Sequence, residues 1–238
     1  MTALDVLPKP VREHLERWAE TLAKQLGDEL VAIVVHGSVV RGEYRPGESD
    51  VDVVVVLRDA PLATLEAIAN VTDLARYSAR IEATVLTEKE IAGASDCFPL
   101  LYDEIKRRHF VLVGRDPFAP VPVHDTHRRL RIEQELREAH VRLRRAVLDA
   151  AGAREVVGGA VARRLKQVRG ALHALLALKG VTCTTDLRTV LAKSGETYHV
   201  DTAPLESPRD NPEQAYIAID RLLTLAIDDV DVIPTSKG

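Results

Sequence analysis

The acidic residues best placed to do chemistry are Asp50 and Asp52, which are separated by one valine in the stretch Ser49-Asp50-Val51-Asp52. Successive side chains of a β-strand alternate between faces, so both carboxylates point the same way while Val51 and Val53 point into the core. Two carboxylates this close repel each other unless they share a cation. Hard oxygen ligands of this kind suit Mg²⁺ that substrate phosphates also bind.

A small polar turn precedes this acidic pair in the sequence. The apolar segment from Val31 to Val35 leads into Gly37-Ser38, and we expect a short helix to follow. Gly37 allows the backbone to approach a phosphate closely, and Ser38 adds a hydroxyl donor. Backbone N–H groups at the start of a helix favour anions. The sequence therefore predicts a phosphate-binding turn that faces a metal-binding carboxylate pair.

In this order the residues resemble the nucleotidyltransferases of the DNA polymerase beta superfamily, whose signature is Gly-Ser, a variable gap and Asp-x-Asp on the next strand. The finer set of His36-Gly37-Ser38, Arg41-Gly42-Glu43 and Ser49-Asp50 is similar to the minimal and antibiotic nucleotidyltransferases rather than to the polymerases. The resemblance implies an α/β (α+β) fold, with a mixed sheet flanked by helices. It extends to about Phe118, so we expect a catalytic domain over residues 1–118.

The same resemblance implies a third carboxylate on a later strand. Residues 80–86 read RIEATVL, a short segment in which Glu82 and Thr84 share one face. Glu82 is the candidate, and its alternative is an ordinary solvent-facing strand residue. We expect Asp50, Asp52 and Glu82 to be the catalytic residues and to hold two Mg²⁺ ions. Glu82 would also help to remove the acceptor proton.

The nucleotide is expected to be ATP. Gly37 and Ser38 would hold its β and γ phosphates, and Arg41 or Arg45 would add positive charge, although either arginine could equally be a surface residue. In kanamycin-type enzymes the base is instead a glutamate of the helical domain. Glu135 and Glu138 are the possible equivalents, and the sequence does not choose between them and Glu82.

The second half of the chain is predicted to be helical. Pro117, Pro120 and Pro122 lie in a linker, and apolar stripes follow at helical spacing, which favours a bundle over residues 119–238. This half loosely resembles the HEPN-type bundles and the C-terminal bundle of kanamycin-type nucleotidyltransferases. We expect it to bind the acceptor or a partner.

In the first half, a helix is predicted from about Asp96 to Arg108.

Composition excludes several classes of function. The chain has 238 residues, of which 46% are hydrophobic, and a formal net charge of −4, which gives no overall drive toward nucleic acid. Many arginines between positions 128 and 145 alternate with glutamates, which favours a solvated helix face over a phosphate-binding surface. No segment has the length and apolarity of a membrane helix, and the two cysteines show no disulfide or metal-ligand spacing. A cytoplasmic protein is expected.

The leading hypothesis is a nucleotidyltransferase that moves AMP from ATP to a hydroxyl of a small molecule bound between the two domains. An aminoglycoside-type antibiotic is one such acceptor, and the activity would then confer antibiotic resistance. Two alternatives stay open: an adenylyltransferase or antitoxin that modifies a partner protein, and a nucleotide-binding module without catalysis. A homodimer is expected by analogy with the kanamycin-type enzymes, and template-directed polymerisation is not expected.

Overall fold

The computed structural model describes residues 3–233 and divides into two compact units, Met1–Val123 and His124–Gly238. The first unit contains a four-stranded sheet in the order β3-β2-β1-β4. Strand β2 pairs antiparallel with β1 and parallel with β3, and β1 pairs antiparallel with β4. The strands span Leu30–Val35 (β1), Val51–Leu57 (β2), Ile81–Thr87 (β3) and Phe110–Gly114 (β4). This mixed sheet with flanking helices confirms the predicted fold class.

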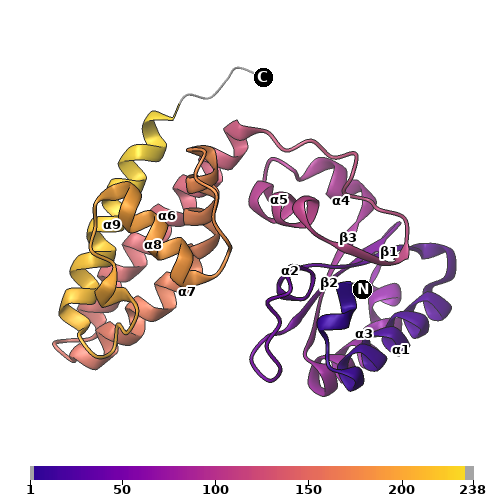
Figure 1. Ribbon diagram of the computed structural model, residues 1–238. Helices are drawn as coiled ribbons and strands as arrows, with labels where there is room; N and C mark the ends of the chain where they lie inside the picture. The colour runs from indigo at the N-terminus through magenta and orange to yellow at the C-terminus, as the bar shows by residue number, and fades with distance from the viewer. Residues whose placement is uncertain (1–2, 234–238) are drawn as a thin grey trace. The chain divides into compact units, whose positions relative to one another are not determined.

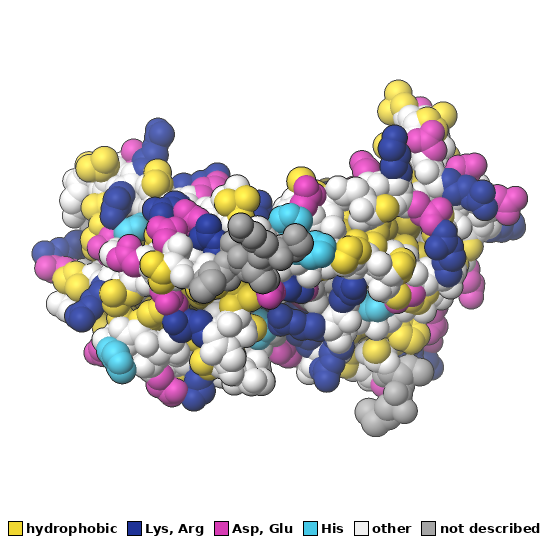
Figure 2. All heavy atoms as spheres, turned by 90° about the horizontal axis from the view of Figure 1, so that it is seen from above, with side chains coloured by type: hydrophobic (Ala, Val, Ile, Leu, Met, Phe, Trp, Pro, Cys, Tyr) yellow, Lys and Arg dark blue, Asp and Glu magenta, His cyan; other side chains and the backbone are white. Residues whose placement is uncertain are grey.

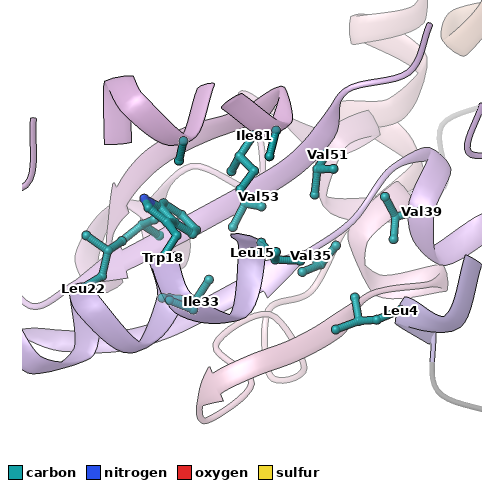
Figure 3. Packing of buried hydrophobic residues seen from close by; sticks show 14 of the residues in the cluster. Leu4, Leu15, Trp18, Leu22, Ile33, Val35, Val39, Val51, Val53 and Ile81 are labelled. Carbon is teal, nitrogen blue, oxygen red and sulfur yellow. The ribbon is translucent and has the colours of Figure 1, made fainter. Parts of the chain in front are cut away.

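One face of the sheet is covered by α1 and α3, which pack together in Figure 1. Their bounds are Lys9–Leu26 for α1 and Leu62–Ala79 for α3. Figure 3 shows Leu15, Trp18 and Leu22 of α1 packed against Ile33 and Val53 of the sheet. The side chains that face this layer from β2 occupy its odd-numbered positions, and Val51, Val53, Val55 and Leu57 are all buried.

The even-numbered positions of β2 face the opposite layer. Val54 and Val56 pack there with Tyr102 and Ile105 from the helix α5. The helices on this side are α4 (Glu88–Gly93) and α5 (Pro99–Arg107), and a single helical turn, α2 (Ser38–Arg41), follows β1. Asp52 lies on this same face, because it shares the alternation of Val54 and Val56. Because both faces of β2 are packed, the carboxylate of Asp52 lies beside a second apolar core.

Helix α5 begins three residues later than the prediction of about Asp96. Phe98 has φ −121° and ψ 45°, and Pro99 occupies the first turn. A proline disfavours the α conformation in the residue before it, so the helix begins at the proline itself.

The second unit is formed by four α-helices among its described residues, as the apolar stripes predict. These are α6 (Asp125–Asp149), α7 (Arg154–Leu178), α8 (Leu187–Tyr198) and α9 (Pro212–Val232). Helices α6, α7 and α9 contact one another, and α8 packs on α7 and α9. Asn211 caps α9 by accepting a hydrogen bond from the backbone N–H of Gln214. The short 3-10 helices span Ala3–Val6, Gly27–Glu29 and Ala203–Leu205.

The end of β4 depends on a residue without a side chain. Gly114 has φ +82°, and a Cβ at this position would lie 2.0 Å from the carbonyl oxygen of Val31. Gly47 has nearly the same dihedral, φ +81°, but no atom lies within 4 Å of its ideal Cβ. A side chain at Gly47 would therefore meet backbone strain alone, whereas a side chain at Gly114 would meet both backbone strain and steric overlap.

We expect Gly114→Ala to lower the free energy of unfolding by more than Gly47→Ala. Both substitutions place alanine at positive φ, which costs about 1–2 kcal/mol. Only Gly114→Ala also forces a Cβ against a backbone carbonyl, which adds about 1–3 kcal/mol of overpacking. Urea denaturation of the two variants and the wild type measures the difference. Equal losses would show that the sheet edge relaxes away from Val31.

Candidate functional site

The turn after β1 lies directly against Asp52. Gly37 has φ 72° and ψ −146°, a conformation that glycine adopts readily, and an added Cβ would lie 2.2 Å from Asp52 Oδ2. The backbone N–H of His36 donates to the carbonyl oxygen of Asp52 over 3.0 Å. The following helix α2 has only four residues, so its dipole is small and the turn backbone and the Ser38 hydroxyl are what it offers to an anion.

The carboxylates are brought together by the parallel pairing of β2 and β3. Asp52 is the register partner of Glu82, so their Cα atoms are neighbours across the ladder, about 5 Å apart in such a pair. Asp50 lies two residues before Asp52 and immediately precedes Val51, the first residue of β2. The structure thus places Asp50, Asp52 and Glu82 at one edge of two adjacent strands, next to the Gly37 turn.

Asp52 has an unusual electrostatic environment. Its pKa is raised from 3.8 to about 6, first by burial and then by the neighbouring charges of Glu104, Asp50 and Glu82, while the charge of Arg41 opposes the rise. A carboxylate surrounded by other carboxylates in a partly dry site has a high affinity for a proton or for a cation.

Glu104 is a member of this site that the sequence did not reveal. It lies on α5, and its carboxylate forms an ion pair with the guanidinium of Arg41. Arg41 Nε also donates to Glu43 Oε2 over 2.9 Å. The helix around Glu104 was predictable, but no motif or spacing marks this glutamate, because its approach to Asp52 results from how α5 packs on the sheet.

The two arginines proposed for phosphate binding differ in their surroundings. The Arg41 side chain is 14% exposed and is engaged by two glutamates, whereas the Arg45 side chain is 76% exposed. Arg45 Nη1 lies 3.7 Å from Glu48 Oε2, a weak surface contact. Arg41 is therefore held near Asp52, and Arg45 is a solvated residue of the connecting loop.

His36 connects the strand end to the acidic group. Its side chain is largely enclosed, and Nδ1 is buried with no hydrogen-bond partner among the described residues. Burial lowers the pKa of His36. The negative charge of Glu104 raises this pKa, and the positive charge of Arg41 lowers it. We expect a neutral imidazole at pH 7.

Glu82 is half exposed, and the contact it makes with a cation among residues 3–233 is long, since Arg76 Nε lies 3.9 Å from its Oε1. That separation is too long for a hydrogen bond. The two glutamates proposed as alternative bases, Glu135 and Glu138, are each paired within α6. Glu135 Oε1 accepts from Arg131 Nε over 2.9 Å, and Glu138 forms an ion pair with Arg142.

The arginine-rich helix α6 carries several ion pairs between its own side chains. Besides the two pairs just named, Glu133 contacts Arg129 and Arg137. Over the molecule as a whole, Figure 2 likewise shows positive and negative side chains interspersed on the face it presents. These contacts favour the solvated, salt-bridged helix face over a surface for nucleic acid.

The described residues contain no cluster of three or more His, Cys, Asp or Glu side chains arranged to hold a metal by themselves. Mg²⁺ does not need such a cluster, since it commonly takes one or two carboxylates and completes its shell with water and phosphate oxygens. Over residues 3–233, no helix combines the length and apolarity needed to cross a membrane.

Comparisons with known proteins identify the class of this site. Residues 15–109 match the family model described as a nucleotidyltransferase domain. Residues 15–109 therefore form a nucleotidyltransferase domain, as the resemblance in sequence implied, and this domain supports an enzyme of that class. The match includes the Gly37 turn and all three predicted carboxylates.

A solved structure extends the likeness to both units. The spectinomycin adenyltransferase AAD(9) from Enterococcus faecialis, crystallised with ATP and spectinomycin, has a TM-score of 0.56 over 92% of this chain and 99% of its own. The two sequences are 13% identical, so this similarity shows the fold. No curated protein sequence matches the chain.

The raised pKa of Asp52 predicts a pH-dependent cost to stability. Well below pH 3.8, its ordinary pKa, the carboxyl is protonated in both the folded and the unfolded chain, and no penalty arises. As the pH rises through about 6, the folded chain must hold an ionised carboxylate beside other carboxylates, and stability is lost. The shift corresponds to at most ~3 kcal/mol, which partial exposure reduces to about 1–2 kcal/mol.

We expect Asp52→Asn to be more stable than the wild type at pH 8 in EDTA, by about 1–2 kcal/mol, because the amide carries no charge. At pH 3, below both pKa values, the two proteins should unfold at the same denaturant concentration. Urea denaturation at both pH values measures this. Asp73→Asn, on the exposed surface of α3, is the control and should show no such dependence. A wild type as stable as Asp52→Asn at pH 8 would contradict the assigned environment.

Proposed function

We propose that this enzyme transfers AMP from ATP to a hydroxyl group of a small antibiotic of the aminoglycoside or spectinomycin kind and releases pyrophosphate. The observation that carries the proposal is the register pairing of Asp52 with Glu82 beside the Gly37 turn, within a matched nucleotidyltransferase domain. The fold shared over both units with an adenyltransferase crystallised with ATP and spectinomycin supports the choice of donor and acceptor.

The donor set at this edge of the sheet fits Mg²⁺. Asp52 is partly buried among Asp50, Glu82 and Glu104, which disfavours its ionised form unless a cation is present. We assign Asp50 and Asp52 as metal ligands, with Glu82 as a third ligand for a second ion. Bound Mg²⁺ would supply charge stabilisation for the attacking and the leaving oxygens.

The phosphates of ATP are assigned to the turn. Gly37 brings the backbone close to Asp52 without a side chain, and Ser38 contributes a hydroxyl donor at the start of α2. Arg41, held by Glu43 and Glu104, contributes positive charge near Asp52. Exposed Arg45 is the weaker candidate, because it has no comparable anchor.

In the proposed reaction the acceptor oxygen forms a bond to the α-phosphorus, and the bond from that phosphorus to the bridging oxygen of pyrophosphate breaks. The hydroxyl proton passes to a carboxylate base. We assign this role to Glu82, because it is half exposed beside Asp52 and its ion-pair contact among the described residues, with Arg76 Nε, is as long as 3.9 Å. Glu135 and Glu138 are weaker candidates, since each is paired with an arginine of its own helix.

We assign the helical unit to binding of the acceptor, which is the second substrate of the enzyme. This assignment is supported by the coverage of 92% of the chain in the comparison with AAD(9), which includes most of that unit. A hydroxyl on a partner protein would be processed by the same carboxylates, so the acceptor must be identified by assay.

The direct test is an assay of purified protein with ATP, Mg²⁺ and a panel of aminoglycosides and spectinomycin, followed by pyrophosphate release and mass spectrometry of the acceptor. We expect one acceptor to gain a single AMP. Asp50→Asn and Asp52→Asn should each reduce the rate by about 100-fold or more, because charge stabilisation of the transition state is lost. Asp73→Asn, an exposed carboxylate on α3, should retain the wild-type rate. Full activity in either site variant would overturn the ligand assignment.

A second test uses the close approach of the turn. Gly37→Ala places a Cβ within 2.2 Å of Asp52 Oδ2 and must displace the carboxylate. We expect Mg²⁺-dependent binding of a non-hydrolysable ATP analogue to weaken at least about tenfold, since a displacement of ~1 Å in a site is costly. Gly42→Ala is the matched control, with φ +77° and open space around its Cβ. Isothermal titration compares them, and equal affinities would contradict the role of the turn.

A further inference from the structure

Arg80 has a backbone conformation that arginine rarely adopts. It ends α3 with φ 53° and ψ 39°, in the left-handed region, and its N–H reaches the carbonyl oxygens of Ala75 and Arg76. Glycine is the usual residue at this position of a helix end, because a side chain is strained there. Strained residues of this kind tend to occur where function constrains the backbone.

The side chain of Arg80 is directed to the proposed metal ligand. Its Nε donates to Asp50 Oδ1 over 2.9 Å, and its Nη2 lies 2.8 Å from the same oxygen. Nη2 also donates to the carbonyl oxygen of Glu48 over 3.3 Å. Both side chains of the pair are more than 40% exposed, so the ion pair adds little to folding stability.

The backbone of Arg80 is joined to the same site. Its carbonyl oxygen accepts from the N–H of Val51 over 2.9 Å, at the start of the parallel ladder that pairs Asp52 with Glu82. Arg80 therefore fixes the chain on both sides of Asp50: its side chain binds the carboxylate and Glu48, and its carbonyl binds the next residue.

We infer that Arg80 is a positioning residue for Asp50: it holds Oδ1 and leaves Oδ2 oriented to bind the cation. The inference rests on the proposed function, because it assumes that Asp50 is a metal ligand. The planar guanidinium can place two N–H groups on one oxygen in a fixed direction, which an ammonium group cannot do.

The experiment compares Arg80→Gly, Arg80→Lys and His199→Gly with the wild type. His199 ends α8 with φ 52°, so replacing it by glycine relieves the same strain far along the chain from the carboxylates. Arg80→Lys keeps the charge and the strain but loses the guanidinium plane. The probe is Mg²⁺ with a non-hydrolysable ATP analogue in isothermal titration, and the Tm in EDTA reports folding.

We expect Arg80→Gly and Arg80→Lys both to weaken Mg²⁺-dependent binding by about 10- to 100-fold, the usual effect of losing a partner that orients a metal ligand. The Tm of Arg80→Gly should equal or exceed that of the wild type, as for His199→Gly, whose affinity should stay at the wild-type value. This combination separates positioning from folding.

Other outcomes overturn the inference. Unchanged affinity in Arg80→Gly would show that Arg80 only ends the helix, and wild-type affinity in Arg80→Lys beside weak binding in Arg80→Gly would show that charge alone matters. A lower Tm in Arg80→Gly with a parallel loss of affinity would show a structural role. If the wild type itself shows no Mg²⁺-dependent binding, the proposed function fails, and the inference fails with it.

Discussion

The site depends on the contact between the Gly37 backbone and the Asp52 carboxylate. No side chain fits between them, since a Cβ on Gly37 would lie 2.2 Å from Asp52 Oδ2. This contact places a strand-borne carboxylate against a polar turn, which brings a candidate metal ligand and a candidate phosphate site together. It also encloses Asp52, and burial is the main cause of its raised pKa. Folding thus tolerates an unfavourable charge at the position where the proposed chemistry needs one.

The sheet makes this arrangement rigid. Side chains alternate along β2, so Val51 and Val53 enter the layer under α1 and α3, while Asp52 shares its face with Val54 and Val56. A shift of one residue in register would move the carboxylate into the apolar core, which burial of both faces makes very unfavourable. The parallel pairing with β3 then fixes Glu82 beside Asp52.

Two arginines form ion pairs with carboxylates at this edge of the sheet. Arg41 is held by Glu43 and Glu104, while Arg80 binds Asp50. Two of these contacts join segments distant in sequence: Arg41 and Glu104 are 63 residues apart, and Arg80 and Asp50 are 30 residues apart. Because the arginines are directed by other groups, they act on the orientation of the carboxylates as well as on their charge.

The sequence by itself determined the Gly-Ser turn, the Asp-x-Asp pair, the strand that carries Glu82 and the helices of the second unit, because these follow from local spacing and periodicity. It also showed that Asp50 and Asp52 share a face. It did not show Glu104 near Asp52, the ion pair of Arg80 with Asp50, or the enclosure of His36. Those were decided by the tertiary structure, because each depends on how a helix packs on the sheet or where a loop returns to it, and no local pattern encodes such a distance.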